Sequence, residues 1–145
     1  MENDISKAMK RYNHLMSEIE AAYHEISWKL KLSDSAMQIL YTIYDNGTSC
    51  LLQDICHDTG LSKQTINSAI RKLERESIIY MEAVGAKNKK VCLTEEGKQF
   101  ADQTAGRVIQ AENEIFASWS SEDVQKYLDL TEAYLSALRK KAEEF

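Results

Sequence analysis

Apolar residues recur every three or four positions along most of this chain, which is the spacing of amphipathic helices. The first such stripe runs from position 5 to position 30, and the last from position 124 to position 138. Between them, the same spacing predicts helices that begin after Ser33, Ser49, Ser62 and Thr94, whose hydroxyls can cap a helix N-terminus. The helix after Thr94 is predicted to continue as far as the serine pair at 120–121. The pattern therefore predicts a mainly helical protein.

One stretch follows a different pattern. Residues 78–84 and 91–93 are rich in strand-forming side chains, and residues 85–90 between them include glycine, asparagine and three lysines. This arrangement is typical of a β-hairpin. Two short strands cannot enclose a core, so the predicted fold class is mainly α with a small β-wing.

Before the hairpin, the chain has the pattern of a helix-turn-helix. A short helix predicted over residues 50–59 is ended by Gly60, which can adopt the left-handed conformation, and Ser62 caps the next helix. Ile66, Ala69, Ile70 and Leu73 then form the inward apolar side of the second helix. The turn between the two helices is very tight.

The outer face of this second helix is polar and contains no acidic residue. Asparagine and glutamine can bind adenine edges, arginine can bind guanine, and a helix N-terminus can face a phosphate. A polar face can also be simply solvated. The candidate DNA-binding residues on this helix are Ser62, Lys63, Gln64, Thr65, Asn67, Ser68, Arg71 and Lys72.

The charge distribution supports nucleic acid as a partner. The chain has a net charge of −5, but residues 61–93 carry +4 and the remainder −9. A basic block in an acidic chain marks an electrostatic footprint. Lysines on a hairpin can also protect an edge strand against aggregation, which is the alternative interpretation here. The candidate wing contacts are Lys87, Asn88, Lys89 and Lys90.

With the segments GLSKQT, IRKLE and VCLTEEG in this order, the chain resembles the multiple-antibiotic-resistance regulator (MarR) family over nearly its whole length. The resemblance implies a dimeric winged helix-turn-helix regulator that binds a palindromic operator. Such a regulator is usually a repressor, and a small ligand or an oxidant releases it from the DNA. Family members commonly carry an aspartate and an arginine in the wing, where this chain has Gly85 and Lys87. They also often have glycine after the second helix of the motif, where this chain has Ser77.

The long apolar stripes at the two ends are not explained by packing on a small helix-turn-helix domain. The resemblance implies that residues 1–32 and 100–145 form a dimerisation region around a DNA-binding domain at 33–99. A homodimer would place two reading helices about one DNA turn (roughly 34 Å) apart and require a palindromic site. A closed monomeric bundle is the alternative.

The sequence gives fewer indications of the small molecule that would regulate such a protein. The family's pocket lies between the dimerisation and DNA-binding domains, although aromatic residues at helical spacing are more often part of a core. Histidines 14, 24 and 57 raise a metal-sensor alternative, but their spacing favours solvated helix faces, and we expect neither a metal site nor a cofactor. The candidate pocket residues are Tyr12, Tyr23, Trp28, Tyr41 and Tyr44.

Three cysteines, in a chain with no apolar leader segment and no apolar run of membrane-spanning length, predict free thiols in the cytoplasm and no membrane association. Cys50, expected at the start of a helix, is predicted to have a lowered pKa, and Cys56 and Cys92 to be small core residues. No catalytic motif is present, so an enzyme is not expected. The alternative function is a helical protein-interaction module that does not bind DNA specifically.

Overall fold

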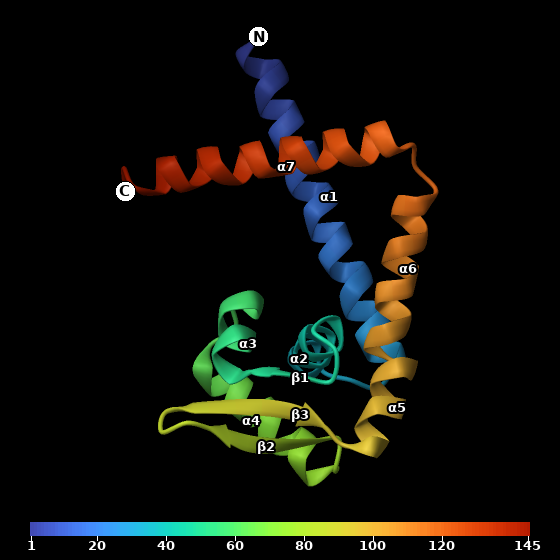
Figure 1. Ribbon diagram of the computed structural model, residues 1–145. Helices are drawn as coiled ribbons and strands as arrows, with labels where there is room; N and C mark the ends of the chain where they lie inside the picture. Colours follow the sequence, from blue (N-terminus) through green and yellow to red (C-terminus); the bar gives the residue numbers. More distant parts are fainter. The chain divides into compact units, whose positions relative to one another are not determined.

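The computed structural model describes residues 1–145, apart from the side chain of Glu2. The chain forms two compact units, Met1–Gly106 and Arg107–Phe145. Helix α6 begins at the end of the first unit, and α7 belongs to the second (Figure 1). The elements in chain order are α1 (Glu2–Lys29), α2 (Asp34–Asp45), β1 (Ser49–Leu51), α3 (Leu52–Thr59), α4 (Lys63–Arg75), β2 (Ile79–Val84), β3 (Asn88–Leu93), α5 (Glu95–Gln103), α6 (Ala105–Ala117) and α7 (Ser121–Ala142).

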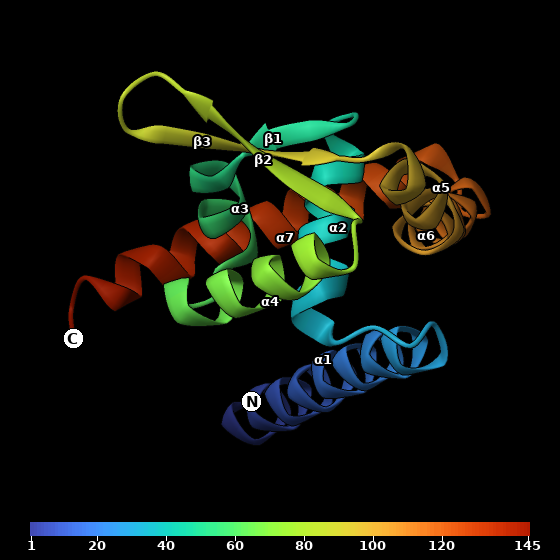
Figure 2. The same cartoon turned by 90° about the horizontal axis from the view of Figure 1, so that it is seen from below.

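Helix α2 is the centre of the first unit. It contacts α1, α3, α4 and α5, and it also packs on β1 and β3 (Figure 2). One face of the sheet is therefore covered by helices, and the core lies between these two layers. The large side chains that are fully buried come from both layers: Ile39, Leu40, Ile43, Ile55, Ile66, Leu73 and Val91.

The sheet has three antiparallel strands in the order β1-β3-β2, one strand more than the sequence predicts. The predicted helix start at Ser49 is wrong, because residues 49–51 pair with β3 and Cys50 lies opposite Val91. Helix α3 starts only at Leu52 and has no side-chain cap. The pairing with β3 provides hydrogen-bond partners for the backbone N–H and C=O groups of residues 49–51, which would otherwise need partners within a helix.

The other three predicted caps are confirmed. The side-chain oxygens of Ser33, Ser62 and Thr94 each accept a hydrogen bond from the backbone N–H three residues later, at 3.1, 3.1 and 2.9 Å. Each hydroxyl satisfies one of the donors that a helix N-terminus leaves unpaired. Local sequence signals thus fix where α2, α4 and α5 begin.

The left-handed conformation predicted for Gly60 is also confirmed, and Ser77 adopts the same conformation. Gly60 ends α3 with φ +65°, and Ser77 follows α4 with φ +61°. At Ser77 the helix closes through two hydrogen bonds, from its own N–H to the Glu74 carbonyl and from the Ile78 N–H to the Leu73 carbonyl, each 3.0 Å. This pair of bonds is the Schellman arrangement, which glycine usually completes.

The wing has a shorter turn than predicted. Val84 lies opposite Asn88, so strand β3 already includes Asn88, Lys89 and Lys90, and only residues 85–87 form the tip. Continued cross-strand pairing accounts for this difference, since each added pair satisfies more backbone groups. Of the wing lysines, Lys87 alone lies in the turn.

The predicted continuous helix after Thr94 is interrupted, with α5 ending at Gln103 and α6 starting at Ala105. Between them Thr104 leaves the helical conformation, with φ −119° and ψ −90°, and its hydroxyl donates to the Phe100 carbonyl at 2.7 Å. Threonine side chains that bond back to the preceding turn bend helices. The break is therefore a local effect that hydrophobic spacing does not record.

Helices α1 and α7 keep their apolar stripes exposed. The seven large apolar residues of α1 that repeat in alternating steps of four and three, from Ile5 to Ile26, are 37–67% exposed. Six large apolar residues of α7 are 43–62% exposed, and none of its residues is buried. Among the described residues, no helix is long and apolar enough to cross a membrane.

Candidate DNA-binding site

The candidate site begins with the α3–α4 pair. The Gly60 N–H donates to the Cys56 carbonyl at 3.3 Å, which closes α3, and Ser62 caps α4 only two residues later. Ile55 and Ile66 are fully buried where the two helices meet the core. These features hold α4 firmly and leave its opposite side free.

The free side of α4 contains the candidate residues. Its apolar stripe is buried, and the candidate side chains are exposed except for Asn67, which is half-buried. The residues farthest from the core form one line with steps of four, three and four: Gln64, Ser68, Arg71 and Arg75.

Arg75 is a residue that our sequence interpretation did not include in the site. It is exposed in the last turn of α4, four positions after Arg71. Extending the helical spacing by one more turn would have identified it.

The two hydroxyl residues at the start of α4 have structural bonds. The Ser62 hydroxyl donates to the Thr65 hydroxyl oxygen at 2.8 Å while it accepts from the Thr65 N–H. Ser62 therefore has its donor and its cap position in use, whereas the Thr65 hydroxyl still has a proton to donate. Of the two, Thr65 is better placed to contact DNA.

Helix α4 and the wing are joined by a compact junction. The Thr94 hydroxyl donates to the Ser77 carbonyl at 2.6 Å, and the Thr94 N–H donates to the Ile78 carbonyl at 3.0 Å. Gly97 lies against the same carbonyl of Ile78, and a side chain there would collide with it. The end of α4 is thus bonded to the start of α5, directly after the wing.

The predicted pocket residues do not share one environment. Tyr12 and Tyr23 belong to the exposed stripe of α1, Trp28 is 73% exposed, and Tyr41 and Tyr44 are half-buried. A hydrogen bond with Asp102, together with the charge of that carboxylate, raises the pKa of Tyr44. The ring of Tyr44 also lies against Gly106, where an added Cβ would come within 2.9 Å of it.

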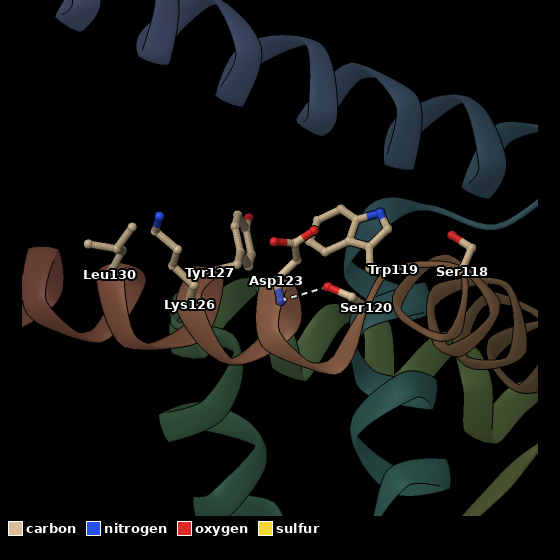
Figure 3. A pocket seen from close by; sticks show the side chains of 7 residues that line it. All are labelled: Ser118, Trp119, Ser120, Asp123, Lys126, Tyr127 and Leu130. Carbon is tan, nitrogen blue, oxygen red and sulfur yellow. Dashed lines mark hydrogen bonds between the residues drawn. The ribbon is translucent and has the colours of Figure 1, made fainter.

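A groove lies elsewhere, within the second unit (Figure 3). Its volume is about 540 Å³, and it is lined by the α6–α7 turn and the first half of α7. Trp119 and Tyr127 pack edge to face with ring centroids 5.6 Å apart, and Phe116 lies 5.3 Å from Trp119. The sequence interpretation did not single out this cluster. The groove residues are Ser118, Trp119, Ser120, Asp123, Lys126, Tyr127 and Leu130.

The predicted lowered pKa of Cys50 is wrong. Burial, followed by the nearby Asp54 and Asp58 carboxylates, raises the pKa of this thiol to about 11. The error follows from the misplaced helix start, since Cys50 lies in β1 and faces the core with Val91. Cys92 is buried as predicted, whereas the prediction that Cys56 is a core residue is wrong, because Cys56 is half-buried.

The three histidines each contact one nearby carboxylate. His24 bonds Asp34 at 2.7 Å, and the other two lie 3.3–4.0 Å from an acid on their own helices. Among the described residues, no three side chains of His, Cys, Asp or Glu are grouped to hold a metal ion.

Comparison with known proteins connects this geometry to a class. Residues 32–80 match a family model described as winged helix-turn-helix DNA-binding. No curated protein sequence matches the chain. A MarR family regulator from Neisseria meningitidis has a similar structure over 94% of this chain and 97% of its own, with a TM-score of 0.81 and 18% sequence identity.

Two further solved structures are similar. MepR from S. aureus, in a complex with DNA, shares 17% identity over 89% of this chain and 96% of its own, with a TM-score of 0.68. BpsR from Bordetella bronchiseptica, whose DNA binding is regulated by 6-hydroxynicotinic acid, shares 18% identity over 86% of this chain and 98% of its own, with a TM-score of 0.64.

The central part of the chain is therefore a winged helix-turn-helix domain. The chain as a whole has the fold of solved MarR family regulators, which confirms the fold that the resemblance implies. The matching model describes a DNA-binding domain, the Neisseria meningitidis protein is described as a regulator, MepR was solved in a complex with DNA, and none of these descriptions is that of an enzyme.

Proposed function

We propose that this protein is a transcriptional regulator that binds a palindromic DNA site as a homodimer. The observation that carries the proposal is the acid-free line of exposed residues on α4, next to a basic wing. Arginine and glutamine on a helix of this kind can bind base edges in the major groove, and lysines can bind phosphates. The DNA complex of MepR, which has the same fold, supports this proposal.

Within this site we assign two kinds of contact. Gln64, Thr65, Asn67, Ser68 and Arg71 read or approach bases, because they lie along the outer side of α4 and its flanks. Lys63, Lys72 and the wing residues 87–90 bind the backbone or the minor groove, since flexible ammonium groups suit phosphates better than base edges. Arg75 extends the line toward the next phosphate or base.

The exposed stripes of α1 and α7 support a homodimer. The α1 stripe repeats in alternating steps of four and three, which is the average spacing of 3.5 residues found along a coiled-coil seam, and the α7 stripe also repeats in steps of three and four. Apolar stripes of this length are unusual on the surface of a monomer. A second copy of the chain can cover them and place two α4 helices for one DNA site.

We propose that the regulator acts as a repressor that a small effector releases from DNA. The regulation of BpsR by 6-hydroxynicotinic acid supports the effector, and the aromatic candidates remain Tyr12, Tyr23, Trp28, Tyr41 and Tyr44. The cytoplasmic location expected from the sequence is part of the same proposal.

The deciding experiment is selection of duplex DNA from a random pool with the purified protein. We expect an enriched inverted repeat with half-site centres about one turn (roughly 10 bp) apart. An enriched single half-site would contradict the homodimer. Absence of any enrichment, with or without weak binding, would contradict sequence-specific regulation and favour the protein-interaction alternative.

A further inference from the structure

The two paired lysines of the wing point to opposite faces of the ribbon. Residues directly opposite each other in an antiparallel pair share a face, and neighbours along a strand alternate. Lys89 lies opposite Ala83 and shares its face with Val91, whereas Lys90 lies opposite Glu82 and shares its face with Cys92. The two lysines therefore have different neighbours although they are adjacent in the sequence.

The face of Lys89 is the one that the helices cover. Val91 and Ile79 on this face are buried, and the strands contact α2, α3 and α4. Toward the wing the helices no longer cover it, and Lys89 is exposed. Lys89 thus lies on the same side of the sheet as α4, the helix that carries the candidate base contacts.

The other face contains an acid, Glu82, at the position that faces Lys90. The Glu82 carboxylate accepts a hydrogen bond from the Cys92 thiol at 3.8 Å, which holds it over this face. Lys90 is directly across from Glu82 and is half-buried. Opposite charges at facing positions attract each other, which reduces what Lys90 can offer to a third partner.

We propose that Lys89 is a DNA-phosphate contact of the wing, and that Glu82 keeps Lys90 from contributing and so limits the affinity of the wing for DNA. The inference rests on the proposed DNA-binding function and refines its assignment of residues 87–90: of the two lysines paired within β3, Lys89 binds phosphate and Lys90 is neutralised. Glu82 then sets the strength of a contact that carries no sequence information.

Three variants test this division: K89A, K90A and E82Q. Their dissociation constants for one duplex of random sequence are measured between 50 and 200 mM salt. Each phosphate contact contributes about 0.9 to the slope of log affinity against log salt, or about 3.5-fold over this range. For K89A we expect the magnitude of the salt slope to fall by about 0.9 for each wing. For K90A we expect the wild-type slope, and for E82Q a rise in the magnitude of up to about 0.9 for each wing.

A fourth variant, K89R, keeps the charge and is expected to restore the slope, which separates a charge effect from a packing effect. Thermal unfolding of all variants controls for folding. Equal losses in K89A and K90A, or an unchanged slope in E82Q, would overturn the inference and leave the proposed function standing. Wild-type protein without salt-sensitive DNA binding would overturn the proposed function itself.

Discussion

Helices α4 and α7 both have an apolar stripe, but the stripe of α4 is buried and the stripe of α7 is exposed. In α4 the residues Ile66, Ala69, Ile70 and Leu73 are at most 8% exposed, so the stripe is completed by the chain's own core. In α7 no residue is buried, although the stripe is longer. The periodic pattern alone predicts that a face is covered, and the structure shows whether the same chain covers it.

The same comparison separates what each region is for. The covered stripe of α4 leaves a polar face outward, which is suited to a charged and hydrogen-bonding partner such as DNA. The uncovered stripes of α1 and α7 are suited to an apolar partner, which we propose is a second copy of the chain.

The largest effect is expected from a charge placed in the uncovered stripe of α1. Ile19→Asp should weaken self-association by more than 100-fold, because each of the two carboxylates would have to be buried in an apolar seam at an effective cost of several kcal/mol per ion. Analytical ultracentrifugation across a concentration series measures this. Ala21→Asp, on the opposite side of the same helix, is the matched control and should leave the dimer intact. Dimers of equal strength in both variants would remove α1 from the interface.

Truncating a side chain in the buried stripe of α4 should lower the stability of each chain by itself, independently of a partner. Leu73→Ala is expected to lower the free energy of unfolding by about 2–5 kcal/mol, because it opens a cavity in a filled core. Leu138→Ala in α7, where the side chain is 53% exposed, should matter only where a partner covers it. Urea unfolding at several protein concentrations distinguishes the two. If L138A lowered the free energy of unfolding by an amount that does not change with protein concentration, the stripe of α7 would be covered within one chain, and the contrast with α4 would be wrong.

Thiol labelling tests burial within the winged domain. Because the pKa of Cys50 is raised to about 11, its thiolate fraction at pH 8 should be about 100-fold lower than at the ordinary value of 9. Burial raises the folded pKa above the unfolded one, so this group stabilises the fold below pH 9, and that stability is lost as the pH rises toward 11. Labelling of single-cysteine variants with a chromogenic disulfide should therefore be much slower at Cys50 than at half-buried Cys56. Comparable rates would show that β1 opens readily.

A substitution on the polar face of α4 should change the affinity for DNA and leave the free energy of unfolding nearly unchanged. Arg71→Ala is expected to cost about 1–3 kcal/mol in binding to the selected duplex and to relax the preference at one base of each half-site. The unfolding free energy should change little, because the side chain is exposed. Titration against duplexes mutated one position at a time measures both effects. A uniform loss across all duplexes would assign Arg71 to the phosphates.

The smallest effect is expected at the tip of the wing. Lys87→Ala should weaken binding to all sequences alike and reduce the salt slope by about one for each phosphate that the wing no longer binds. Fluorescence anisotropy over a series of salt concentrations is sufficient. An unchanged slope would exclude the tip from the interface and leave the paired part of β3 as the contact.

Most of the fold could be predicted from local signals in the sequence. Hydroxyl residues before apolar stripes located the starts of α2, α4 and α5, since a cap is a contact between residues only three positions apart. Strand β1 could not be predicted in this way, because its partner lies about forty positions later in β3. The same long-range pairing buries Cys50, and its predicted pKa shift failed with it.

The candidate site was predicted in part for the same reason. The outer face of α4 follows from helical spacing, and Arg75 was missed only because the spacing was not extended far enough. The division of Lys89 from Lys90 could not be seen, because it depends on which residue of β2 lies opposite each lysine. Helical spacing likewise does not show that Thr104 interrupts α5 and α6, since its hydroxyl bonds to the preceding turn.

The bonds from Thr94 to Ser77 and Ile78 have a consequence for the rate at which the proposed DNA complex would dissociate. They tie the end of α4 to the base of the wing at distances of 2.6 and 3.0 Å. Two binding regions joined by a flexible linker can detach one after the other, and each can rebind while the other remains in place. Two regions joined rigidly detach together. In the DNA complex that we propose, one concerted step would therefore set the lifetime, and the proposed effector would withdraw the wing at the same moment if it tilted α4.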